Sequence, residues 1–65
     1  MLRHNNPLDR LYAGLDQFTM CVRQTLVNAG VPPMSQPTPI ELRDWYIDER
    51  ISVEEALDRA RAALA

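Results

Sequence analysis

The sequence predicts an all-α fold, a small three-helix domain in which a long amphipathic N-terminal helix packs on a C-terminal helical hairpin. Apolar residues recur at helical spacing in three segments, and each segment is preceded by a residue type that caps helix N-termini. Proline and glycine cluster only between the first and second segments, where helices end. The expected helices span about 7–29, about 39–49 and about 53–64.

The first helix is expected to begin after Asn6, with Pro7 in the first helical position and Asp9 near the positive end of the helix dipole. Apolar or small residues then follow at alternating steps of three and four, which is a heptad pattern sustained for about three repeats. We call this set the seam; its members are Leu8, Leu11, Leu15, Phe18, Val22, Thr25 and Ala29.

Two glycines mark special positions along this helix. Gly14 costs about 1 kcal/mol relative to alanine in a helix interior unless a neighbouring backbone approaches closely there. Gly30 supplies a left-handed C-terminal cap, and Pro32 and Pro33 cannot continue the helix. Residues 31–37 therefore form a proline-rich, extended connection.

The hairpin is predicted from two capping boxes, Thr38 with Glu41 and Ser52 with Glu55, in which the hydroxyl and the carboxylate bind each other's backbone N–H groups. The turn between the two helices must lie just before Ser52, because a capping residue leaves helical geometry. The apolar stripes of the hairpin are Leu42, Trp45 and Tyr46 on its first helix and Val53, Ala56, Leu57, Ala60 and Leu64 on its second.

The 65 residues fit a single domain, 1–65, of which residues 1–5 are expected to be a flexible tail. The chain has one cysteine, Cys21, which cannot form an intrachain disulfide. Its one histidine, His4, is too few to complete a Cys/His metal cluster with that cysteine. A chain this short gains little stability from its own core. The alternatives are therefore a homodimer or a complex with an obligate partner on one side, and a well-packed monomer on the other.

The charge pattern bears on the classes of partner. No apolar run reaches the roughly 20 residues of a membrane span, and the N-terminus has no signal-peptide core, so we expect a cytoplasmic protein without membrane contact. All seven basic residues are arginine; residues 1–31 carry a net charge of +1 and residues 32–65 a net charge of −3. Because the third helix opens with Glu54 and Glu55, nucleic-acid binding is disfavoured.

Enzymatic chemistry is not expected. The sequence contains no Glu-x-x-His, glycine-rich phosphate loop or Cys-x-x-Cys motif. Cys21 lies next to the seam residue Val22, where a thiol usually serves only for packing. We therefore expect no catalytic residue, cofactor, metal or small-molecule substrate.

The hairpin segment from Trp45 to Leu57, together with the long first helix and the proline-containing connection, resembles the small antitoxins that pair with Fic-domain AMP-transferase toxins. The resemblance covers roughly residues 19–60. The family's inhibitory helix carries Ser/Thr-x-x-x-Glu followed by Gly or Asn, and the matching stretch has Thr25 and Gly30 but Ala29 in place of the glutamate. The resemblance implies regulatory binding to a larger bacterial protein, without the carboxylate that restrains the toxin's arginine.

These observations predict a non-enzymatic protein–protein interaction module, antitoxin-like or regulatory. A dimeric helical DNA-binding regulator, to which Arg3, Arg10 and Arg23 would contribute, and a small structural or assembly subunit are the alternatives. Whether the seam forms the core or an interface is left open. The candidate partner-binding residues are Leu11, Leu15, Phe18, Val22, Thr25, Trp45 and Tyr46.

Overall fold

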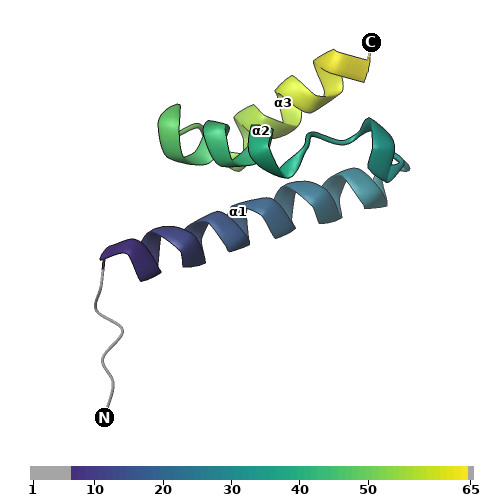
Figure 1. The fold of residues 1–65 in the computed structure, drawn as a ribbon. Helices are drawn as coiled ribbons and strands as arrows, with labels where there is room; N and C mark the ends of the chain where they lie inside the picture. The colour runs from purple at the N-terminus through teal and green to yellow at the C-terminus, as the bar shows by residue number, and fades with distance from the viewer. Residues whose placement is uncertain (1–6, 65) are drawn as a thin grey trace.

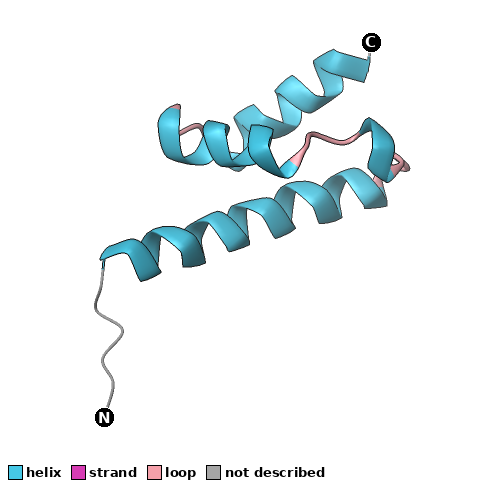
Figure 2. Ribbon diagram, in the orientation of Figure 1, coloured by secondary structure: helices cyan, strands magenta, loops and turns pink. Residues whose placement is uncertain are grey.

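The computed structural model describes residues 7–64 and confirms the predicted all-α architecture. Its elements are α1 (Pro7–Asn28), η1 (Pro33–Ser35), α2 (Pro39–Arg43), η2 (Asp44–Asp48) and α3 (Val53–Leu64). The long α1 lies along one side of the molecule, and α2, η2 and α3 double back over it as a hairpin (Figures 1 and 2). No helix within residues 7–64 is long and apolar enough to cross a membrane.

The end of α1 follows the predicted chemistry. Gly30 adopts a φ of 85°, in the left-handed region. The Val31 N–H donates to the Leu26 carbonyl at 2.9 Å and the Gly30 N–H to the Val27 carbonyl at 2.9 Å, which together form a Schellman motif. The Asn6 cap and the tail over residues 1–5 lie outside the described residues.

The proline-rich connection is tighter than the extended segment expected from its composition. Its middle forms a single 3₁₀ turn, η1, and the Gln36 side-chain amide donates to the Val31 carbonyl at 3.1 Å. Pro37 is buried. The connection therefore fixes where α2 begins on the surface of α1.

In each of the two predicted capping boxes of the hairpin, only one of the two expected hydrogen bonds forms. Thr38 Oγ1 accepts from the Glu41 N–H and Ser52 Oγ accepts from the Glu55 N–H, each at 3.1 Å. Within residues 7–64 neither glutamate returns a hydrogen bond to its capping residue, so the reciprocal half of each capping box is not formed.

The helix predicted over 39–49 is not a regular α-helix throughout. After Arg43 the chain widens into a π-helix, η2, in which the Glu49 N–H donates to the Asp44 carbonyl at 3.0 Å, five residues back. The segment ends at Arg50, whose φ of 55° is left-handed although it is not glycine. Trp45 and Tyr46 both lie inside this widened turn.

The core is small and lies between the C-terminal two thirds of α1 and the hairpin. Its buried residues are Phe18, Val22, Leu26, Leu42, Ala56 and Ala60. Because α3 contributes only alanines to this buried set, its backbone can approach α1 closely. Half-buried residues, including Val31, Ile51 and Leu57, pack around the edge.

Candidate protein-docking surface

The structure divides the seam into a buried part and a surface part. Phe18 and Val22 are buried against the hairpin, so a partner could reach them only if the hairpin moved away. Leu11, Leu15 and Thr25 are half-buried. The seam is therefore neither wholly core nor wholly interface.

The N-terminal part of α1 keeps apolar side chains at the surface. Leu8 is 55% exposed and Tyr12 is 49% exposed. One turn further along, Leu11 lines an open hollow of about 360 Å³ together with Ile47 of the hairpin. We call Leu8, Leu11, Tyr12, Leu15 and Ile47 the N-terminal apolar patch.

Tyr46 fixes the hairpin on α1 at the border between the core and this patch. Its ring packs against Phe18 with a centroid distance of 5.2 Å and a tilt of 46°. Its hydroxyl lies so close to Gly14 that a Cβ at that residue would overlap with it. The close approach at Gly14 therefore comes from a side chain and not from a neighbouring backbone.

Trp45, the other predicted aromatic contact, faces α3. The guanidinium of Arg59 lies over its ring, 5.7 Å from the centroid. Trp45 and Tyr46 are both half-buried, and adjacent residues of the widened turn thus contact different helices. In this structure both aromatic residues serve mainly to attach the hairpin.

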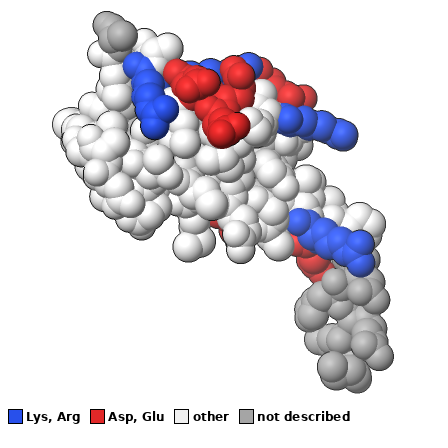
Figure 3. Space-filling model, turned by 180° about the vertical axis from the view of Figure 1, so that it is seen from behind, with Lys and Arg blue, Asp and Glu red and all other residues white. Residues whose placement is uncertain are grey.

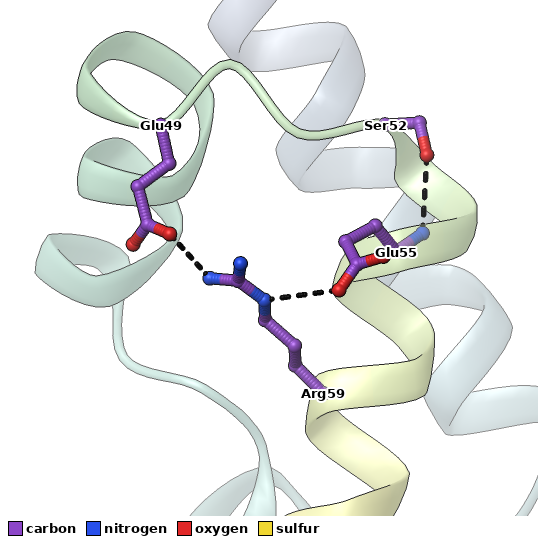
Figure 4. Close-up of polar contacts among 4 residues, drawn as sticks. All are labelled: Glu49, Ser52, Glu55 and Arg59. Carbon is purple, nitrogen blue, oxygen red and sulfur yellow. Dashed lines mark hydrogen bonds and ion pairs between the residues drawn. The ribbon is translucent and has the colours of Figure 1, made fainter.

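Arg59 connects the end of η2 to α3 (Figure 4). Its Nη1 donates to Glu49 Oε1 at 2.7 Å, and its Nε donates to Glu55 Oε2 at 3.3 Å. The hydrogen bond that Arg59 donates to Glu49 is the main cause that raises the pKa of Arg59 above its usual value, against a smaller opposing effect of desolvation. All three side chains are substantially exposed to solvent. This network therefore adds modestly to stability and is a structural feature of the hairpin turn.

Charge is distributed unevenly over the surface. On the face shown in Figure 3, most of the visible acidic side chains lie over the hairpin and others lie beside the start of α1, while a broad area over the C-terminal part of α1 and the connection carries almost no charge. In the sequence between Asp16 and Glu41, Arg23 is the only charged residue. The charge-poor face is more suitable for a protein surface than for a phosphate backbone.

Within residues 7–64, no three His, Cys, Asp or Glu side chains come together in a way that could hold a metal ion. Cys21, expected to pack beside the seam, is instead exposed as a free thiol on α1.

Comparisons with protein-family models, with curated proteins and with solved structures found no match to this chain. The candidate surface therefore rests on the geometry of the chain itself.

Sequence reasoning identified Leu11 and Leu15 but not Leu8, Tyr12 or Ile47 as surface residues for a partner. Leu8 belonged to the seam, and Tyr12 widened the apolar stripe, so both carried the right periodicity. Which end of the stripe stays uncovered depends on where the hairpin docks, and periodicity does not report that position.

Proposed function

We propose that this protein is a non-enzymatic helical interaction module that binds a larger bacterial protein in the cytoplasm through the N-terminal apolar patch. The observation that carries the proposal is that the hairpin leaves Leu8 and Tyr12 about half exposed on a helix whose apolar stripe continues into the core. A helix that presents apolar side chains at steps of three and four is suited to a groove on a partner. Tyrosine at such a site is a common source of binding energy.

A regulatory, antitoxin-like role is the specific form of this proposal. Ala29, at the position where the resembling family has its inhibitory glutamate, is exposed just after the end of α1. Regulation by this chain would therefore depend on the area covered by the docked helix and not on a carboxylate placed in a partner's active site.

The test compares capture of partners by the tagged protein and by two single variants, Leu8→Glu and Tyr12→Glu. Ile40→Glu is the matched control, because Ile40 is 74% exposed and lies outside the patch. We expect the wild type and the control to retain one partner in stoichiometric amount, identified by mass spectrometry, and both patch variants to lose it. Circular dichroism should show the same helix content in all four proteins.

Two results would contradict the proposal. Equal retention of the partner by the patch variants would place binding elsewhere on the molecule. Failure of the wild type to retain any stoichiometric partner would favour the alternative of a dimeric DNA-binding regulator.

A further inference from the structure

A second surface runs along the side of α1 that faces away from the hairpin. Its residues recur at steps of three and four over about two heptads, and all of them are exposed. We call this set the outer face; it consists of Ala13, Asp16, Gln17, Met20, Arg23, Gln24 and Val27. Met20 is 69% exposed and Val27 is 52% exposed, so the middle and the C-terminal end of the face are apolar.

The outer face carries two charges of opposite sign. Asp16 precedes Met20 by four residues, and Arg23 follows it by three. Seven residues along a helix correspond to about 10.5 Å, which is too far for the two side chains to pair well on one helix. Within residues 7–64 neither of them forms an ion pair.

The charges of the outer face match those of a second copy of the same face that runs in the opposite direction. If a second α1 runs antiparallel across Met20, each Asp16 lies near the Arg23 of the other copy. Ala13 then lies opposite Val27, small against branched, and Gln17 lies near Gln24, amide against amide. A parallel arrangement would instead place Asp16 against Asp16 and Arg23 against Arg23, which is repulsive.

We propose that the outer face binds a second copy of this chain, antiparallel about a two-fold axis close to Met20. Charge complementarity selects this occupant, because the same surface supplies both members of each ion pair, as an isologous contact requires. The two Met20 side chains form the centre of the contact, and methionine adapts well to such a packed position.

The contact between the two copies would bury little surface, so the affinity of the dimer should be low. Three apolar residues per copy and two exposed ion pairs place it among interfaces smaller than about 1,200 Å², which are typically weak and transient. We therefore expect the chain to be mainly monomeric at low micromolar concentration and increasingly dimeric toward about 1 mM.

This inference is independent of the proposed function. The outer face points away from the hairpin, and the N-terminal apolar patch includes the hairpin residue Ile47. The dimer would leave both patches accessible at opposite ends of the paired helices, so that one dimer could engage two sites on a partner.

Cysteine cross-linking tests the geometry directly. In a Cys21→Ser background, Met20→Cys should form a disulfide-linked dimer readily under mild oxidation. Val27→Cys alone should form none, because two such residues would lie about 21 Å apart along the helix axis. An equimolar mixture of the Ala13→Cys and Val27→Cys proteins should link to each other.

Charge reversal tests the pairing without cysteine chemistry. Asp16→Arg should weaken dimerisation by about tenfold or more, measured by sedimentation equilibrium. Adding Arg23→Asp to this variant should restore dimerisation to within about threefold of the wild type. Circular dichroism should show unchanged helix content, which separates lost association from lost folding.

Three results would overturn the proposal. First, the wild type could stay monomeric up to about 1 mM. Second, the Val27→Cys protein could form disulfide-linked dimers as fast as the Met20→Cys protein. Third, the variant with both charges reversed could fail to recover dimerisation. None of them depends on whether a larger partner is captured through the N-terminal apolar patch.

Discussion

Replacing Gly14 with alanine should destabilise the protein, although the same change in an ordinary helix stabilises it. Alanine is favoured over glycine in a helix interior by about 1 kcal/mol. Here, however, the new Cβ would overlap with the Tyr46 hydroxyl, and the ring carbon that bears the hydroxyl would lie only 3.0 Å away. The ring can yield only by turning away from Phe18, against which it packs.

The magnitude follows from these two opposing effects. Overpacking of this kind costs typically 1–3 kcal/mol. After subtraction of the helix-propensity gain, we expect Gly14→Ala to lower the free energy of unfolding by about 1 kcal/mol. Urea unfolding followed by circular dichroism, with the same m-value for both proteins, would give this difference from the midpoints.

A double-mutant cycle identifies the cause. Tyr46→Phe removes the hydroxyl, so in that background Gly14→Ala should cost clearly less, with a coupling free energy of about 1 kcal/mol. If Gly14→Ala raises the unfolding midpoint in the wild-type background, Tyr46 does not pack on Gly14 as described, and the argument for the border of the N-terminal apolar patch is refuted.

Three further substitutions test other parts of the fold. Phe18→Asp should unfold the domain or destabilise it by more than about 3 kcal/mol, because it buries an unpaired carboxylate; a variant whose midpoint of urea unfolding equals that of the wild type would mean that Phe18 is not core. Arg50→Gly should stabilise by about 0.5–1 kcal/mol in urea titrations, because it relieves the left-handed φ of 55°. The control Arg43→Gly, at the end of α2 where the backbone is helical, should cost about 1 kcal/mol. Ser52→Ala should lower the thermal midpoint through loss of about 1 kcal/mol of capping, and an unchanged midpoint would contradict the role assigned to that hydroxyl.

The helix boundaries could be predicted because they depend on chemistry that is local in sequence. Gly30 determines the end of α1, and the hydroxyls of Thr38 and Ser52 determine the starts of α2 and α3 through contacts three residues away. The widening at Asp44–Asp48 was not predicted, because the pairing of backbone groups five residues apart carries no recognised sequence signal. Within it, Trp45 and Tyr46 pack on different helices, and these contacts join residues far apart in the sequence.

The division of the seam between core and surface could not be read from the sequence for a related reason. Leu8 and Val22 have the same heptad position, yet one is about half exposed and the other is buried. The difference arises because the connection places the hairpin over the C-terminal part of α1. The outer face was likewise overlooked in the sequence, since Met20 and Val27 form a sparser stripe than the seam on the same helix.

The π-helical turn also determines which changes in chain length the hairpin can accept. A π-turn contains one residue more than the α-helical turn it replaces, so loss of a single residue between Asp44 and Asp48 would return the segment to regular α-helical pairing. The caps on either side would survive such a deletion, whereas Trp45 and Tyr46 could no longer contact α3 and α1 at the same time. A related chain that lacks one residue here should therefore keep its three helices but lose the contact between the tyrosine and Gly14. In such a chain a larger residue could replace the glycine.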